Sequence, residues 1–79
     1  MNVTVYSTPS CPWCHKVKDY LSYKEISFND INVAEDRQAA LDMVRKSGQR
    51  GVPVVDIDGN IVVGFNQAEI DRLIGQTGK

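Results

Sequence analysis

The chain has 79 residues, a formal net charge of −1, and 42% hydrophobic and 24% charged residues. These proportions are ordinary for a soluble globular domain, and the length predicts one domain, residues 1–79, with a modest core. No basic run indicates a nucleic-acid partner. The first residues resemble no signal peptide, and no segment approaches the roughly 20 apolar residues of a membrane span. We therefore expect a cytoplasmic protein, by default a monomer, that binds neither membranes nor nucleic acid.

The first predicted elements are a strand and a helix. Residues 2–6 alternate as a short β-branched strand, and a helix is expected over 12–23. Pro12 fits the first helical position, where its missing N–H would have no partner. The cap of the helix then falls at Ser10 or Cys11. The buried face of this helix is expected to carry Cys14, Val17 and Leu21, which recur at helical spacing.

A second strand and a second helix follow. The segment 26–32 is the predicted strand, with Ile26, Phe28 and Ile31 as its apolar residues. The polar stretch 34–38 opens a helix that should last to about Lys46. The inward-facing residues expected on this helix are Ala40, Met43 and Val44.

The last third predicts a hairpin and a final helix. Residues 53–57 and 61–63 are strand-forming runs joined by Asp58-Gly59, which is a strong hairpin signal. The final helix should end at Gly75. Its expected apolar residues are Ile70, Leu73 and Ile74.

The predicted order of elements is thus β-α-β-α-β-β-α. The first two strands need a helical crossover and should be parallel, whereas the last two should form an antiparallel hairpin. The sequence therefore predicts an α/β domain with a mixed four-stranded sheet and three flanking helices.

The two cysteines, Cys11 and Cys14, lie three positions apart in Cys11-Pro12-Trp13-Cys14. A disulfide between them would close one helical turn and join no distant elements, so redox chemistry explains the pair better than stabilisation. Cys11 falls where the helix begins, beside unpaired N–H groups and the positive end of the helix dipole, which favour a thiolate. We expect Cys11 to attack a disulfide and Cys14, one turn deeper, to resolve the mixed disulfide. Trp13 offers an apolar surface to the substrate.

The residues around the two cysteines also bear on other functions that the pair could have. His15, Lys16 and Lys18 add positive potential. Cys11, Cys14 and His15 supply too few ligands for a structural zinc site in one chain. An iron–sulfur cluster or metal held by Cys11 at a dimer interface is the alternative function. Cys11 to His15 also fits the haem-attachment pattern C-x-x-C-H, but the β-rich periodicity argues against a haem protein.

Arg50-Gly51-Val52-Pro53 is the second informative segment. A proline that opens a strand must lie where no ladder N–H is needed. The residues alone leave two conformations open, a trans bond at the start of an edge strand and a cis Val52–Pro53 bond that aims the Val52 backbone at a substrate. About 5–6% of X–Pro bonds in folded proteins are cis, so the residues alone favour trans.

Nearly the whole chain resembles the glutaredoxin branch of the thioredoxin superfamily. The residues that carry the resemblance are Val3 to Ser7, Cys11-Pro12-Trp13-Cys14, Gly51-Val52-Pro53 and Gly64-Phe65. The resemblance implies a thioredoxin-like fold, thiol–disulfide oxidoreductase activity without a bound cofactor, and a cis Pro53 facing Cys11. It also implies that the Val52 backbone contacts glutathione or a substrate cysteine.

Some positions depart from the members that use glutathione. Those members usually carry a lysine near Thr8, a tyrosine at Trp13, and Gly-Gly where this chain has Gly64-Phe65. The sequence is more similar to glutaredoxin-like redoxins that serve ribonucleotide reductase and are reduced by thioredoxin reductase. The reductant of this chain is expected to be either glutathione or thioredoxin reductase, and the expected substrates are protein disulfides or glutathione mixed disulfides. The further candidate binding residues are Asn66 and Gln67, with Arg50 as an ion partner. Asn66 and Gln67 are predicted either to cap the last helix or to bind a carboxylate at its N-terminus, and the two interpretations stay open.

Overall fold

The computed structural model describes residues 2–78, the side chains of 76–78 excepted. The elements follow the predicted order. The strands are β1 (Val3–Ser7), β2 (Asn29–Asn32), β3 (Val54–Ile57) and β4 (Asn60–Val63), and the helices are α1 (Pro12–Tyr23), α2 (Arg37–Ser47) and α3 (Gln67–Gly78).

One mixed sheet organises the domain, with strand order β2-β1-β3-β4. β1 pairs with β2 in parallel and with β3 antiparallel, and β3 pairs antiparallel with β4. The parallel β1–β2 pair and the β3–β4 hairpin confirm the predicted α/β architecture. Its thioredoxin-like character was implied by the resemblance.

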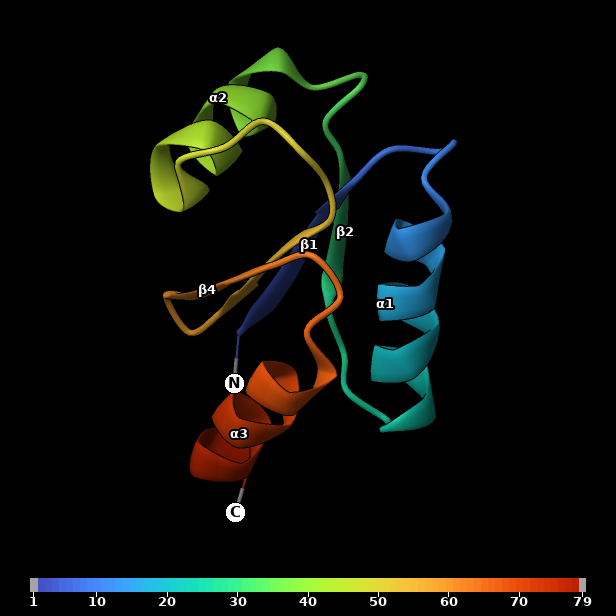
Figure 1. Ribbon diagram of the computed structural model, residues 1–79, viewed down its shortest axis with the longest axis vertical. Helices are drawn as coiled ribbons and strands as arrows, with labels where there is room; N and C mark the ends of the chain where they lie inside the picture. The colour runs from blue at the N-terminus through green and yellow to red at the C-terminus, as the bar shows by residue number, and fades with distance from the viewer. Residues whose placement is uncertain (1, 79) are drawn as a thin grey trace.

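The helices cover both faces of this sheet, α1 and α3 on one and α2 on the other (Figure 1). Alternation along β1 explains the division, because Val3 and Val5 point to the α1 and α3 side whereas Tyr6 points to α2. The larger core cluster consists of Val3, Val5, Val17, Leu21, Val55, Ile57, Val62, Ile70 and Leu73. The smaller cluster consists of Tyr6, Ala39, Met43 and Val54. Burial of these apolar surfaces is the main force that holds the helices to the sheet.

The hairpin turn between β3 and β4 forms as its sequence predicts. Asp58 and Gly59 have φ values of 52° and 91°, the left-handed pair that a tight type I′ turn requires. Asp56 Oδ1 accepts the Gly59 N–H at 2.8 Å, which holds the turn in this shape.

The second strand is shorter than predicted. The expected strand over 26–32 is wrong in its first half, because β2 begins at Asn29, which pairs with Thr4 near the start of β1. The Ile26 N–H instead donates to the Leu21 carbonyl at 2.9 Å and closes the end of α1. Ile26 and Phe28 still pack against the larger core cluster, which explains their apolar character.

The remaining corrections concern element ends and one helix face. α3 continues through Gly75, which the sequence predicted as its end, because Gly75 does not adopt the left-handed conformation that terminates helices. β3 begins one residue after Pro53, which has no N–H for the ladder. On α2 the buried residues are Ala39 and Met43, whereas Ala40 is half-buried. Met43 was expected inside, but Ala39 was not.

Candidate active site

Cys11 caps the first helix. It has an extended backbone conformation and its sulfur accepts the Cys14 N–H at 3.1 Å, while Pro12 occupies the first turn. The thiol is partly exposed and lies 3.9 Å from the carbonyl oxygen of Val52. A negative charge on this sulfur would be stabilised by the N–H group and by the positive end of the helix dipole. The geometry therefore suits a nucleophilic thiolate at Cys11.

Cys14 has a different environment. Its side chain is fully buried on the core face of α1. Burial, followed by the contact with Cys11, raises the pKa of the Cys14 thiol to about 11. Cys14 is therefore a protonated thiol at neutral pH, and both cysteines are free in the structure. The pair thus combines an accessible sulfur with a protected one.

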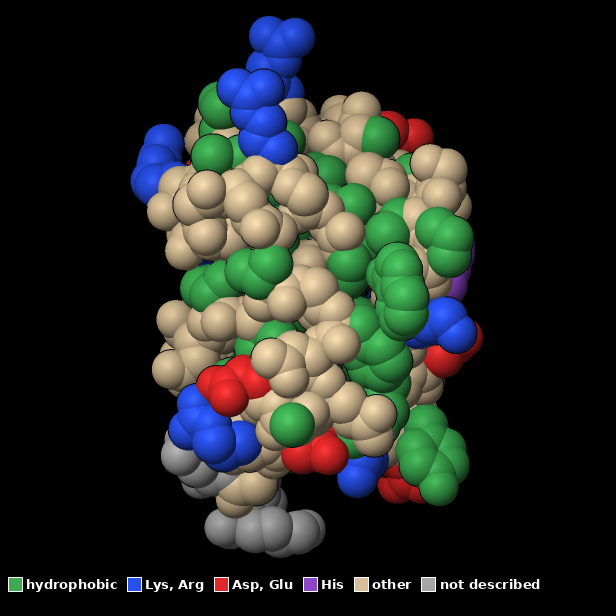
Figure 2. All heavy atoms as spheres, viewed as in Figure 1, with side chains coloured by type: hydrophobic (Ala, Val, Ile, Leu, Met, Phe, Trp, Pro, Cys, Tyr) green, Lys and Arg blue, Asp and Glu red, His purple; other side chains and the backbone are tan. Residues whose placement is uncertain are grey.

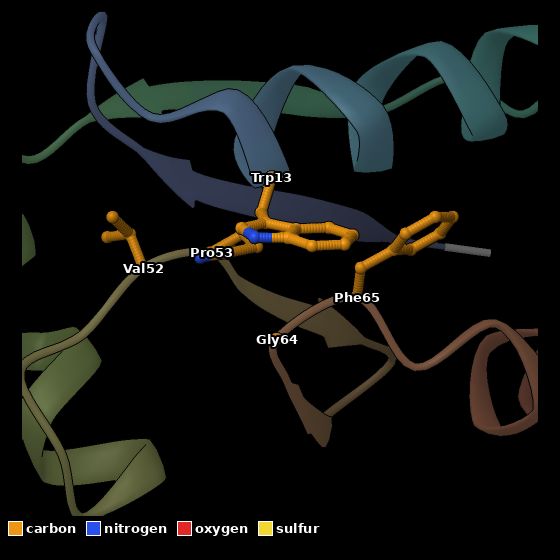
Figure 3. Close-up of a pocket in the computed structure, with 5 residues that line it drawn as sticks. All are labelled: Trp13, Val52, Pro53, Gly64 and Phe65. Carbon is orange, nitrogen blue, oxygen red and sulfur yellow. The ribbon is translucent and has the colours of Figure 1, made fainter.

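An apolar pocket of about 300 Å³ lies beside the pair. Its lining residues are Trp13, Val52, Pro53, Gly64 and Phe65 (Figure 3). Trp13, which is 57% exposed, extends from the first turn of α1 toward Phe65, and the ring centroids are 6.4 Å apart. The Val52–Pro53 peptide bond is cis, as the resemblance implies. In the space-filling view, hydrophobic side chains gather over the α1 side of the molecule (Figure 2).

Phe65 packs against a side chain of α1. Its ring meets the ring of Tyr20 edge to face, with centroids 5.7 Å apart. The Tyr20 hydroxyl in turn donates to the Asp71 carboxylate on α3. Gly64, just before Phe65, has a φ of 74° and donates its N–H to the Pro53 carbonyl at 2.9 Å. In the sequence, Gly64-Phe65 supports the resemblance and marks a departure from members that use glutathione, but it does not predict that either residue lines a pocket.

The other predicted binding residues are spread around the molecule. Thr8 accepts the Cys11 N–H through its carbonyl at 3.4 Å, in the loop that leads to the pair. Asn66 Oδ1 accepts the Glu69 N–H at 3.2 Å and so caps α3, where Gln67 is the exposed first residue. The exposed Arg50 lines a separate groove against α2. Ligand binding by these four residues stays a prediction.

Comparisons with known proteins identify the family. The family model described as Glutaredoxin matches residues 3–62. The chain belongs to the glutaredoxin family. Glutaredoxins are thiol–disulfide oxidoreductases. The geometry of Cys11 and Cys14 agrees with this chemistry.

Three similar proteins illustrate this membership. This glutaredoxin is 58% identical over 72 residues to an uncharacterized glutaredoxin-like 8.6 kDa protein in the rubredoxin operon of Clostridium pasteurianum, covering 91% of this chain and 96% of that one. It is 39% identical over 71 residues to the glutaredoxin-like protein NrdH of Lactococcus lactis, covering 90% and 97%. The structure of NrdH-redoxin from Escherichia coli superimposes with a TM-score of 0.83 at 33% identity, covering 92% and 95%.

The remaining features of this glutaredoxin concern metals and membranes. Within residues 2–78, no group of three or more His, Cys, Asp or Glu side chains is arranged to hold a metal ion. The alternative of a cluster or metal held by Cys11 at a dimer interface is not favoured by the comparisons, because the matched family and relatives are glutaredoxins and glutaredoxin-like proteins. The helices in the same range are too short or too polar to cross a membrane.

Proposed function

We propose that this glutaredoxin is a dithiol reductant of protein disulfides in which Cys11 attacks and Cys14 resolves. One observation carries the proposal: the partly exposed Cys11 sulfur accepts the N–H of Cys14 at 3.1 Å, while the Cys14 sulfur is buried. An exposed sulfur can reach the disulfide of another protein. A buried sulfur reacts only with a partner brought to it, such as the mixed disulfide on Cys11.

The proposed cycle balances without a bound cofactor. The Cys11 thiolate attacks one sulfur of the substrate disulfide, forms a mixed disulfide and releases the other sulfur as a thiolate, which takes up a proton. Cys14 then loses its proton and attacks the Cys11 sulfur, which releases the second substrate thiol and leaves a Cys11–Cys14 disulfide. The substrate gains two electrons and the protein loses them. An external reductant returns the pair to the dithiol state.

We propose that this reductant is a thioredoxin reductase and not glutathione. The residues that line the pocket beside Cys11 carry no charge, whereas glutathione has carboxylates that need cationic or N–H partners. Arg50, the cation predicted to help, lines a different groove. The exposed Trp13 offers a protein surface an apolar contact next to the reacting sulfur. The similarity to NrdH proteins supports the same choice, and we propose ribonucleotide reductase as one protein substrate.

The test compares two NADPH-driven systems with the same protein disulfide as substrate. One contains thioredoxin reductase, and the other contains glutathione with glutathione reductase. We expect turnover with thioredoxin reductase at least about tenfold above that with glutathione, equivalent to 1.4 kcal/mol or more in transition-state free energy. Cys11→Ser serves as the inactive control in both systems. Equal or faster turnover with glutathione would reject the proposed reductant, and no turnover with either would reject the proposed activity.

A further inference from the structure

A hollow of about 310 Å³ adjoins the loop that carries the cysteine pair. It contrasts with the apolar pocket, because most of the residues around it are polar or charged. The residues that line it are Ser7, Thr8, Pro9, His15, Lys18, Asp30 and Asn32. The proposed cycle leaves all of these side chains without a role.

Lys18 is the best-fixed side chain of this hollow. Its side chain is 19% exposed, and its Nζ lies 3.0 Å from Asp30 Oδ2 and 3.5 Å from Ser7 Oγ. The Ser7 hydroxyl donates to Asp30 Oδ1 at 2.9 Å, and Ser7 itself is buried. Although burial opposes ionisation of Asp30, Lys18 and Ser7 hold the pKa of its carboxyl below the usual value. The ammonium and the carboxylate are thus both charged at neutral pH, and strands β1 and β2 fix the position of Lys18.

This fixed cation lies one helical turn from Cys14. Residues four apart on a helix are neighbours, with Cβ atoms about 5–6 Å apart. Burial of Cys14 raises its pKa, and the contact with Cys11 adds to that effect. A backbone hydrogen bond from Thr8 and, to a smaller extent, the positive charge of Lys18 oppose it. Charges interact more strongly where water is scarce, so the positive charge of Lys18 favours ionisation of the buried Cys14 sulfur.

His15 is the remaining titratable group beside the hollow. It is exposed, and its Nε2 lies 3.1 Å from the Pro9 carbonyl oxygen. His15 contributes to the lowered pKa of Asp30 but not to the pKa of Cys14, where the contributing cation is Lys18. Lys18 is therefore the side chain to vary.

We infer that Lys18 is a positioning residue for the resolving step: its ammonium, held by Asp30 and Ser7, stabilises the Cys14 thiolate that attacks the mixed disulfide. The inference rests on the proposed role of Cys14. The proton that Cys14 loses passes through solvent to the departing substrate thiolate, so no further reactant is needed. Lys18 acts on the second step of the cycle and not on the first.

Reaction with 5,5′-dithiobis(2-nitrobenzoate) separates these two steps. Attack by Cys11 releases one thionitrobenzoate, and resolution by Cys14 releases the other. We expect Lys18→Met to slow the second release roughly threefold, because a rise of about one unit in the pKa of Cys14 lowers its thiolate fraction while the more basic thiolate is a better nucleophile. The first release should not change. Lys18→Arg should restore most of the second rate, because it keeps the charge. Asp30→Asn should slow the second release less than Lys18→Met, and should add nothing in the Lys18→Met background.

Two further measurements exclude a merely structural effect. In a Cys11→Ser background, the ultraviolet absorbance of the Cys14 thiolate should titrate at higher pH when Lys18 is Met than when it is Lys. Arg45→Met removes an exposed positive charge from α2 and should change neither release. The inference is overturned if Lys18→Met slows both releases equally or neither, or if the titration does not move. If instead Cys14→Ser releases the second thionitrobenzoate at the wild-type rate, the proposed role of Cys14 is wrong. That outcome is distinct from a failure of the inference about Lys18.

Discussion

The Cys11 sulfur lies 3.9 Å from the Val52 carbonyl oxygen, although the two residues are 41 positions apart in the chain. The pairing of β1 with β3 brings them together, because Tyr6 at the end of β1 is opposite Val54 at the start of β3. The loop after β1 and the loop before β3 therefore meet at one end of the sheet, where α1 also begins.

Replacement of Cys11 and replacement of Cys14 should affect activity differently. Cys11→Ser should abolish reduction of every disulfide, because it removes the attacking sulfur. Cys14→Ser should abolish turnover of protein disulfides but keep reduction of small mixed disulfides that an external thiol can complete. Steady-state assays with both substrate types measure this difference. The assignment of roles is wrong if Cys14→Ser is inactive with all substrates while Cys11→Ser keeps activity.

The stability of the reduced protein should fall at alkaline pH because of Cys14. The native pKa of this thiol is about 11, whereas its ordinary value is 9.0, so between these values the unfolded chain binds fewer protons than the native one. Stability therefore falls as pH rises through this window, by about 2 to 3 kcal/mol in total. Urea unfolding of the reduced wild type at several pH values should show this loss.

Cys14→Ala is the matched control for this pH effect. Other groups also titrate at high pH, but they are the same in both proteins, so the difference between the two isolates Cys14. A wild type and a Cys14→Ala variant with parallel pH profiles would show that burial does not hold the Cys14 proton.

Phe65 should matter for protein substrates more than for small ones. Phe65→Ala removes a wall of the apolar pocket and the neighbour of Trp13. We expect KM for a protein disulfide to rise about tenfold, within the range for loss of a buried aromatic contact. The rate at which Cys11 releases the first thionitrobenzoate from 5,5′-dithiobis(2-nitrobenzoate) should change little. Tyr23→Ala, which removes an 82% exposed ring at the far end of α1, is the control. Equal losses with large and small substrates would contradict a docking role for the pocket.

Asn66 should stabilise α3 as its cap. Asn66→Ala loses the hydrogen bond to the Glu69 N–H and should reduce the free energy of unfolding by about 1 kcal/mol. Asn66→Asp keeps the acceptor and adds a negative charge at the positive end of the helix, so it should retain or increase stability. Thermal unfolding of the two variants checks this. If Asn66 also binds a glutathione carboxylate, Asn66→Asp should weaken turnover with glutathione while leaving stability intact.

The sequence alone determined the local features of this protein. Asp58-Gly59 predicted a turn, Pro12 marked the first turn of α1, and the spacing of Cys14, Val17 and Leu21 marked its buried face. Each of these signals acts within a few residues, so no distant contact was needed to find it. The cysteine motif and its place before a helix likewise indicated the chemistry of the pair.

Only the tertiary structure decided what surrounds that pair. The cis bond before Pro53 was implied by resemblance and not by the residues alone, and Gly64-Phe65 gave no sign of lining a pocket. Lys18 and Asp30 are 12 positions apart, and their ion pair depends on β2 lying parallel to β1 beneath α1. Contacts of this kind depend on strand register and on how each helix lies on the sheet. Many distant residues set both together, so no short stretch of sequence encodes them.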